Sequence, residues 1–546
     1  MKGKWIVLTV LLAIIVSAFL YLKIRKSDDF EPQIKEKLAK LVSEASDGLY
    51  KLDISKIEID ITAGSITAKN ILLSPDSTRM SQLLKAGKLG NNTYTISLKK
   101  LDLEGLSPAV LMDQKNISLD KLVLESPEIE IIHTERSNEV KDTGNMYEKM
   151  KIKDQSFSVK ELYLKNIQLT VNDKVKKNRK ISSFKNLSAF FTDIKIDSST
   201  VNDSTRFLFA KDAVIFMKGF SQVTEKKKYH FDIDSIALHP QNGNLQFYDL
   251  KLKPEGTKED FNRLITYQQD RYDIKIKKGD ISNINWFSLL SDDGFFGDEV
   301  KIEGGTINIY HDRSLPGGPP KSENFPHQML MKAGIPVNMK KVLLKDFSIS
   351  YEELNPKSGH TGTVEFQNVN GEISNLTNIS SEISKNNLIV INAAADFLNA
   401  GKLDAVFRFD LAKEKTGAFS VDATLGKMDG LKLNKITEGL SLVKIKDCKV
   451  DKLQVHITGT NKSAKGDISF AYHDLSFEVL KNDDGELKKR GVFSFIANAL
   501  IVKNSNPSKE NEKLREYTVI HEHDPSRSFF NLIWKTILDG ILKTVK

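Results

Sequence analysis

The sequence predicts a mostly β protein: an elongated, curled antiparallel sheet that forms a groove, with an N-terminal transmembrane helix and a C-terminal amphipathic helix. An eight-residue pattern of alternating apolar residues recurs seven times along the chain. Helical periodicity is confined to the two ends and a few short connectors. The 546 residues include 40% hydrophobic residues and only 14 prolines, so a large folded core is expected.

The repeated pattern reads apolar, x, apolar, x, x, apolar, x, apolar. In a straight strand, the two-residue polar step would turn the second apolar pair to the opposite face, because side chains alternate with a period of two. A bulge or corner at the step would keep both pairs on one face and curl the sheet. The seven copies lie at residues 52–59, 96–103, 117–124, 157–164, 231–238, 337–344 and 448–455.

Two copies support a structural repeat over a chance alternation of apolar residues. The sequences ISLKKLDLE (96–104) and ISLDKLVLE (117–125) differ at only two positions. Turn signals such as Asn242-Gly243-Asn244 separate further strand-like segments. The expected total is roughly two dozen strands, whereas open twisted sheets rarely exceed about ten without curling. The scarcity of helices favours an antiparallel meander over parallel winding.

The chain divides by composition into six segments. The Pro/Gly-rich stretch SLPGGPPKSENFP is interpreted as a loop or as the seam between two halves of the groove. The segments are a transmembrane anchor (1–27), a connecting helix (28–48), the first part of the β-groove (49–313), the Pro/Gly-rich break (314–336), the second part of the groove (337–505), and a linker with the C-terminal amphipathic helix (506–546).

The N-terminal segment contains an uncharged apolar run, WIVLTVLLAIIVSAFLYL. As a helix this run would rise about 27 Å, which matches a bilayer core. A cleaved signal peptide is the alternative, since Val16-Ser17-Ala18 resembles a cleavage site, but the apolar run continues past it. We therefore expect an uncut anchor, with the N-terminus inside and the bulk of the chain translocated. The expected anchor residues are Trp5, Leu8, Leu11, Ile15, Phe19 and Leu22.

The C-terminal residues return to helical spacing. On the polar side, the one acid, Asp539, is outnumbered by the basic residues Arg527, Lys535, Lys543 and Lys546. Such a helix could lie on a membrane surface, or it could cap the open end of the sheet, and the sequence leaves both alternatives open. The membrane-facing residues in the first alternative are Phe529, Phe530, Ile533, Trp534, Ile537, Leu538 and Ile541.

Charge and cysteine content exclude several classes of protein. The net charge of +8 arises from 80 basic and 72 acidic residues that are scattered along the chain. No basic face with interleaved aromatic residues is visible, so no nucleic-acid partner is expected. The one cysteine, Cys448, excludes an intrachain disulfide and a cysteine-based zinc cluster, and it is interpreted as a core thiol.

No catalytic motif is present in the sequence. It has no G-x-S-x-G element, and none of its Gly-Lys pairs has the glycine five positions upstream that a phosphate-binding loop requires. His521 and His523 would share one face of an extended segment and could bind a metal, but a third ligand is missing. We interpret them as part of a solvated linker. The protein is therefore expected not to be an enzyme, with no catalytic residues, no metal site and no cofactor.

Three stretches resemble the AsmA-like family, which is related to TamB within the bridge-like lipid-transfer group. These are the anchor and helix followed by LYKLDISKIEIDITAGSITAKNILLSPD (49–76), the strand pattern in LKKLDLEGLSPAVL and LDKLVLESPEIEII, and residues 443–481. The resemblance implies an inner-membrane anchor, a periplasmic sheet with an apolar groove, and a role in phospholipid transport and outer-membrane biogenesis. Phospholipid and the inner membrane are the implied partners, and outer-membrane or other envelope proteins are candidates.

The apolar positions of the repeats are the candidates for the floor of the groove. Such a floor would shield acyl chains from water at about 0.8 kcal/mol per buried methylene group. The alternative is a scaffold or outer-membrane assembly factor whose sheet encloses a packed core. The groove candidates are Ile54, Ile57, Ile59, Ile96, Leu98, Leu101, Leu103, Leu119, Leu122, Leu124, Val159, Leu162, Leu164, Val342 and Leu344.

Overall fold

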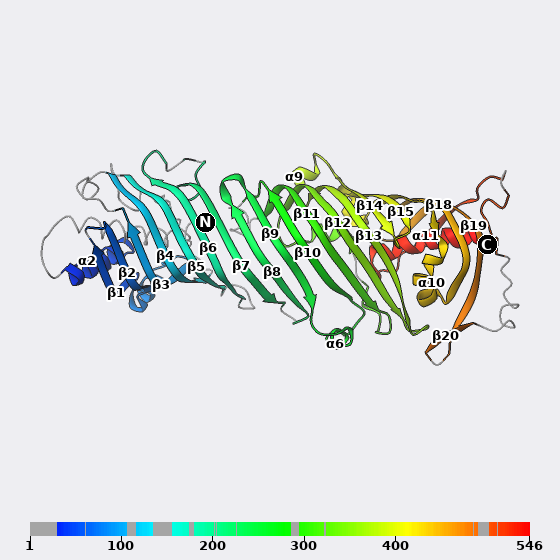
Figure 1. The fold of residues 1–546 in the computed structure, drawn as a ribbon, viewed down its shortest axis with the longest axis horizontal. Helices are drawn as coiled ribbons and strands as arrows, with labels where there is room; N and C mark the ends of the chain where they lie inside the picture. Colours follow the sequence, from blue (N-terminus) through cyan, green and yellow to red (C-terminus); the bar gives the residue numbers. More distant parts are fainter. Residues whose placement is uncertain are drawn as a thin grey trace. The chain divides into compact units, whose positions relative to one another are not determined.

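The computed structural model describes residues 30–60, 62–105, 116–134, 156–173, 180–200, 203, 205–224, 227–285, 294–320, 324–483, 485–489, 502–509 and 512–546. The expected transmembrane anchor (1–27) lies outside these residues. Of the described residues, 61% are in strands and 17% in helices, which confirms the mostly β prediction. The strands pair into a mostly antiparallel sheet that does not close (Figure 1). The chain divides into two compact units, residues 1–220 with 234–245 and residues 221–233 with 246–546.

Unit 1 begins with a helix on the residues where the sequence predicts one, and it continues as a ladder of neighbouring strands. Consecutive strands pair antiparallel, except that β4 and β5 are parallel. Its elements are α2 (Phe30–Ala45), β1 (Tyr50–Asp60), β2 (Ser65–Pro75), α3 (Ser77–Lys85), β3 (Asn92–Glu104), β4 (Asn116–His133), β5 (Ser156–Asp173), β6 (Lys180–Ile196) and β7 (Ala210–Val223).

The division between the units falls within β7, within β8 (Tyr229–His239) and at the start of β9, and η1 (Pro240–Asn242) belongs to unit 1. Unit 2 contains its own ladder, in which β9 pairs with β10 and β11 is parallel to β12. Its elements are β9 (Asn244–Pro254), α6 (Lys258–Arg263), β10 (Asp270–Ser282), β11 (Phe295–Asp312), α8 (Pro326–Met331), β12 (Val337–Asn355), β13 (His360–Thr377), α9 (Ser380–Ile383), β14 (Leu388–Phe397), β15 (Gly401–Asp410), η2 (Leu411–Thr416), β16 (Phe419–Leu425), β17 (Met428–Asp429), η3 (Gly430–Leu433), α10 (Asn434–Ser441), β18 (Val443–Gly459), β19 (Ser463–Asp483), β20 (Glu486–Lys489), β21 (Glu516–Glu522) and α11 (Phe529–Val545).

Two parallel pairs depart from the predicted meander. A parallel neighbour can form only if the connection returns the chain to the end of the sheet where the previous strand began. The Pro/Gly-rich break (314–336) is this connection between β11 and β12, and it lies inside unit 2. The residues of a strand read alike in parallel and antiparallel ladders, so no local pattern indicates the change of direction.

The polar step of the repeat is a kink that keeps both apolar pairs on one face, as predicted. In residues 96–103, the four apolar side chains, Ile96, Leu98, Leu101 and Leu103, are all buried. The ladder between β2 and β3 pairs Ile71 with Leu98 and Lys69 with Lys100 and omits the pair between them. One residue of the omitted pair, Asn70, has a φ of 48°. The kink therefore involves two neighbouring strands at the same level.

Residues with a left-handed backbone conformation lie at the same kink in successive strands. In unit 1 they are Ser126 in β4, Asn166 in β5 and Asn186 in β6, with φ of 51°, 55° and 56°. In unit 2, Asp346 in β12 lies level with Gly304 in β11, since Glu303 pairs with Lys345 and Gly305 with Phe347. Glycine, asparagine and aspartate tolerate this backbone conformation better than other residues do. An Asn, Asp or Gly within a strand pattern is therefore the sequence signal for the kink.

Replacing Asp346 with valine is expected to destabilise the protein, because a β-branched residue fits poorly at its φ of 57°. The expected loss is about 1–2 kcal/mol in the free energy of unfolding, measured by urea titration. Asp346→Gly should be nearly neutral. The exposed neighbour Lys345 supplies the matched control, since Lys345→Val adds the same side chain at a position outside the left-handed region. Equal effects of the two valines would contradict this account of the kink.

Candidate functional site: the apolar face of the sheet

The groove candidates of unit 1 come together on one face of the sheet. Strand pairing places Ile59 opposite Ile66, Ile66 opposite Leu103, and Leu103 opposite Leu122. The same row continues through Leu162 to Phe191 and Ala213. The other candidates of this unit lie in neighbouring cross-strand rows on the same face. One of these rows joins Leu101, Leu124 and Leu164. Of the predicted groove residues, only Val342 and Leu344 lie in unit 2.

In unit 1 these side chains are buried instead of lining an open trough. Leu119 has no exposed surface, and only Ile59 and Leu164 among the unit 1 candidates are partly exposed. They form one apolar cluster with Ile34 and Leu38 of α2. The expectation of an open trough therefore does not hold for these residues, because apolar side chains of the chain itself pack against them.

Helix α2 is fixed to the edge of the sheet at the kink in β1. The Glu31 carboxylate accepts a hydrogen bond from the backbone N–H of Ile57 at 2.9 Å, and the Lys35 ammonium donates to the carbonyl of Ser55 at 2.6 Å. Glu31 and Lys35 also form an ion pair at 2.8 Å. The hydrogen bond from Lys35 lowers the pKa of Glu31. These contacts occupy backbone groups of an edge strand that would otherwise be free to pair with another strand.

Unit 2 has a continuous apolar face built from cross-strand rows. One row joins Ile274, Ile307 and Ile349 in β10, β11 and β12 and then reaches Phe366. A second row runs across eight hydrogen-bonded strands. Its members are Ile281, Val300, Val342, Ile373, Ile391, Phe407, Val421 and Ile457.

Many apolar side chains on β10, β11 and β12 remain partly exposed, whereas Ile281, Val342 and Phe347 are buried. Among the described elements, α10 packs on β12, β13 and β18, and α11 packs on β18, β19 and β21. The apolar side chains of β10 and β11 are therefore covered less than those of the later strands. The partly exposed residues are Ile274, Ile276, Val300, Ile302, Ile307, Ile309, Leu344 and Ile349.

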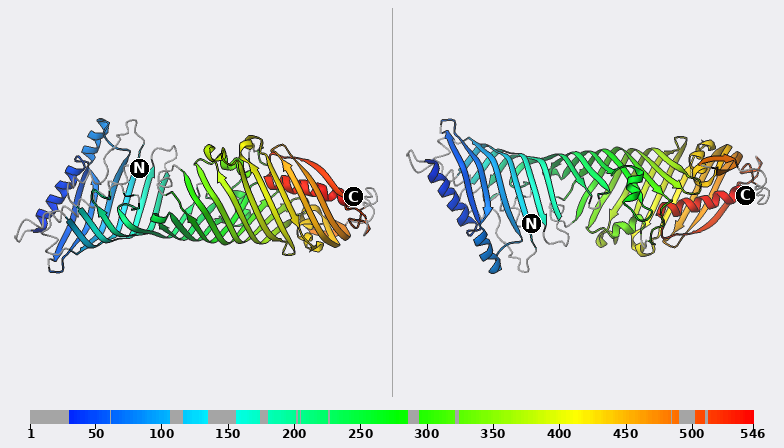
Figure 2. Two further views of the ribbon diagram at one scale, coloured as in Figure 1. Left: turned by 90° about the horizontal axis from the view of Figure 1, so that it is seen from above. Right: turned by 90° about the horizontal axis from the view of Figure 1, so that it is seen from below.

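Helix α11 covers the far end of this face, beside β18, β19 and β21 (Figure 2). Its contact with the sheet is close: a Cβ atom added at Gly540 would lie 2.6 Å from Cβ of Ile468. Thr536 and Thr544 are buried and donate their hydroxyl hydrogen bonds to the carbonyls four residues earlier. The sheet-facing side of α11 therefore combines small residues with large apolar ones.

The predicted membrane-facing residues of α11 separate into two groups. Phe529 and Ile533 are buried in the core, and Ile537 packs against the same cluster. Phe530 is 64% exposed. The buried group faces the sheet, so α11 caps this end of the sheet. Capping is the second of the two alternatives that the sequence left open for this helix. The remaining residues of the set, Trp534, Leu538 and Ile541, are partly exposed.

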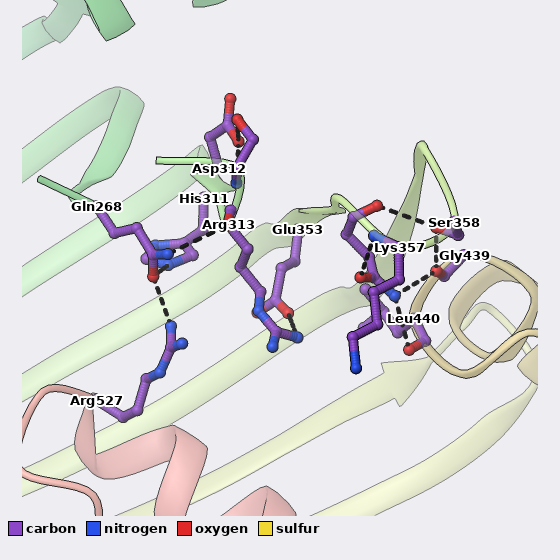
Figure 3. A network of polar contacts seen from close by, with 12 residues as sticks. Gln268, His311, Asp312, Arg313, Glu353, Lys357, Ser358, Gly439, Leu440 and Arg527 are labelled. Carbon is purple, nitrogen blue, oxygen red and sulfur yellow. Dashed lines mark hydrogen bonds and ion pairs between the residues drawn. The ribbon is translucent and has the colours of Figure 1, made fainter. Parts of the chain in front are cut away.

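A partly buried polar network fixes the segment before α11 to the ends of β10, β11 and β12 (Figure 3). Arg527 donates to Oε1 of Gln268 at 2.8 Å, and the Nε2 amide of Gln268 donates to the carbonyl of Arg313 at 3.2 Å. Arg313 in turn forms an ion pair with Glu353 at 3.0 Å. The hydroxyl of Tyr351 donates to Glu353, and burial raises the pKa of Tyr351. We name these five residues the Arg527 network.

The Arg527 network was not foreseen from the sequence. Arg527 and Gln268 are separated by 259 positions, and neither belongs to a motif. Each charged member has a partner within the network, so the arrangement stabilises structure without presenting an evident catalytic group.

The two histidines considered as metal ligands belong to strand β21 and the segment after it, not to a solvated linker. Nδ1 of His521 lies 2.7 Å from Oδ2 of Asp539 in α11, whereas Nδ1 of His523 lies 3.0 Å from the carbonyl of Asn461. Within the described residues, no group of three or more ligating side chains could hold a metal ion. Cys448 is buried, and burial raises the pKa of its thiol to about 11.

The opposite, polar face of unit 2 has a hollow of about 670 Å³ across β15, β16, β18, β19 and β21. Asp422 in this hollow hydrogen-bonds to His456 at 2.6 Å and to Arg408 at 2.6 Å. The hydrogen bond from His456 lowers the pKa of Asp422. Asp422 already has these partners within the protein, so the hollow offers a weaker basis for a ligand site than the apolar face does.

The fold and this site define a class: a mostly β protein in which the strands of each unit present an apolar face. No protein-family model matches the chain, and the comparison with curated proteins gives no significant match. None of the helices among the described residues combines the length and apolar character that crossing a membrane requires. The predicted anchor residues, from Trp5 to Leu22, lie outside the described part of the chain.

Proposed function

We propose that this protein is a membrane-anchored periplasmic AsmA-like protein that carries phospholipid along an apolar β-groove and supports outer-membrane lipid homeostasis. The observation that carries the proposal is the set of partly exposed apolar rows on β10, β11 and β12. Ile274, Ile307 and Ile349 are aligned across three strands and retain contact with solvent. An aligned apolar surface of this kind marks a binding site more often than isolated exposed residues do.

An acyl chain is the ligand that such rows would hold best. Each methylene group moved from water onto the face contributes about 0.8 kcal/mol. The phosphate head group would remain in solvent at the margin of the face, since burying it without partners is unfavourable. Binding of this kind requires no cofactor, metal or catalytic residue, so the proposal retains the sequence-based expectation of a non-enzymatic protein.

The membrane-related part of the proposal has its support in the sequence. The apolar run of residues 5–22 would anchor the chain in the inner membrane, and the repeats would lie in the periplasm, as the resemblance implies. The inner membrane would supply lipid to the groove. An envelope protein is the candidate partner at the outer membrane.

Placing aspartate in the partly exposed apolar rows of β11 and β12 is expected to remove bound phospholipid. In Ile307→Asp with Ile349→Asp, two carboxylates would face the acyl chains, and the phospholipid that copurifies with full-length protein should fall at least fivefold. The amount is measured by lipid extraction and mass spectrometry. The matched control is Asn308→Asp with Ser350→Asp, because these paired residues lie next to the others in the same strands and face the opposite side.

The control pair should retain the wild-type amount of phospholipid. A parallel urea titration checks that the two double variants have comparable stability. If lipid content is the same in both variants, the apolar rows do not bind acyl chains and the proposal is wrong.

A scaffold with a closed core is the second candidate, and the burial of the unit 1 face favours it. Leu98, Leu119 and Leu124 are almost fully buried by other side chains, as in a packed core. A scaffold should purify without phospholipid from the same cells. The lipid extraction described above therefore distinguishes the two candidates.

A further inference from the structure

Helix α11 has more apolar surface than its contact with the sheet requires. Phe529, Ile533 and Gly540 lie on the side that packs on the strands. A second apolar stripe begins at Phe530 and continues at four-residue spacing through Trp534 and Leu538. A helix that only capped the sheet would need one apolar stripe, with polar residues over the rest of its surface.

The second stripe is partly used by the protein itself. Trp534, Ile541 and Val545 pack against a cluster that includes Phe470 and Tyr472. Phe530, in the first turn of the helix, is the part of the stripe that remains most exposed. Its ring is 64% exposed although its centroid lies 6.4 Å from that of Phe407.

Phe407 connects the ring of Phe530 to the partly exposed apolar rows on β10, β11 and β12. It belongs to the cross-strand row that passes from Val300 through Ile373 and Ile391. These four side chains are all partly exposed. The row passes from Val300 through the buried Val342 to Ile373, and Ile373, Ile391 and Phe407 pack against the neighbouring core cluster. It therefore forms an apolar, partly exposed path from β11 along the face of the sheet toward Phe530.

The N-terminal end of α11 is held in place on this side. Ser528 caps the helix by accepting a hydrogen bond from the N–H of Asn531 at 3.3 Å. Arg527 joins Gln268 through the Arg527 network, and Asn324 donates to the carbonyl of Arg527 at 3.3 Å. Phe530 is thus part of a fixed helix turn and not of a loose end.

We propose that Phe530, resting on Phe407, forms the end wall of the lipid site, against which phospholipid acyl chains on the apolar face of unit 2 terminate. This inference rests on the proposed function and adds its boundary. Helix α11 would then define where the acyl-binding surface stops. The strands beneath the helix, β18, β19 and β21, would be closed to lipid because α11 already occupies them.

Site-specific photo-crosslinking tests the end wall and the groove separately. Benzoylphenylalanine is introduced into full-length protein at position 530, at position 307, or at position 520, one position per variant. The proteins are incubated with vesicles of phosphatidylethanolamine and phosphatidylglycerol that carry a radiolabelled phosphate, and they are then irradiated. Ile520 is the matched control, because it is 70% exposed and apolar but alternates with the buried Val519, so it faces the opposite side of β21.

The expected result is at least fivefold more lipid adduct at positions 530 and 307 than at position 520. An adduct at 307 with only the background level at 530 would overturn the end wall while leaving the proposed function standing. Background levels at both positions would overturn both. A protein adduct at 530 in place of a lipid adduct would also overturn the inference, since the exposed ring would then bind a polypeptide.

Discussion

Replacing Gly540 with leucine is expected to lower the free energy of unfolding by about 2–3 kcal/mol, the upper range for overpacking a well-packed contact. A Cβ atom at this position would already lie 2.6 Å from Cβ of Ile468, which is shorter than side chains can tolerate. The leucine would also gain helix propensity over glycine, worth about 1 kcal/mol. The steric effect is larger, because α11 must move off the sheet to make room.

Urea unfolding followed by circular dichroism measures this change, and hydrogen exchange over residues 529–545 shows whether α11 has loosened. The matched control is Lys543→Leu, which adds an equally large apolar residue at an exposed position of the same helix. That variant should stay within about 0.5 kcal/mol of the wild type. Similar losses in the two variants would show that α11 is not closely packed on β19.

Lowering the pH from about 6.5 to about 4 is expected to destabilise the protein through His327 by up to about 3 kcal/mol. His327 is 1% exposed, its ring lies 5.0 Å from that of Phe409, and neither ring nitrogen has a hydrogen-bond partner among the described residues. Burial lowers its pKa from 6.5 to about 4, and the charge of Asp410 opposes this shift in part.

The sign follows from the proton that each state binds. Between the two pKa values, the unfolded chain holds a proton on His327 that the folded protein does not, so acid favours unfolding. The stabilisation is complete above about pH 6.5, declines as the pH falls, and is lost below about pH 4. His327→Phe removes the titrating group while keeping an aromatic ring in the core.

The difference between wild type and His327→Phe isolates this residue from the other titrating groups. Urea titrations at several pH values should give a difference in stability that changes by about 3 kcal/mol across the interval. The variant should match or exceed the wild type at neutral pH, because the core then lacks two unpaired nitrogens. A difference that is constant with pH would contradict the buried, neutral state of His327.

The periodicity of the sequence predicted local structure well. The repeat identified strands, and its polar step marked kinks that keep Ile96, Leu98, Leu101 and Leu103 on one face. This succeeds because a period of two and a burial preference are local properties of the chain. Helices α2 and α11 occupy residues near the two ends where the sequence has helical spacing.

Properties that depend on distant residues could not be predicted in the same way. The parallel pairing of β11 with β12 depends on the path of a connection. The burial of Leu119 depends on which side chains pack against it. The Arg527 network joins residues that no short motif relates. Likewise, an apolar helix face reads the same whether it meets a membrane or a sheet, so Phe529 and Phe530 could not be distinguished by sequence.

Native mass spectrometry of the unmodified full-length protein, released from detergent, tests the central claim most directly. If the partly exposed apolar rows of β10, β11 and β12 hold acyl chains, the spectrum should contain the mass of the protein alone. It should also contain masses equal to the protein plus one or more phospholipid molecules. Collisional activation should release these phospholipids intact. A spectrum that contains only the bare protein, under conditions that retain lipid on a known lipid carrier, would contradict the account.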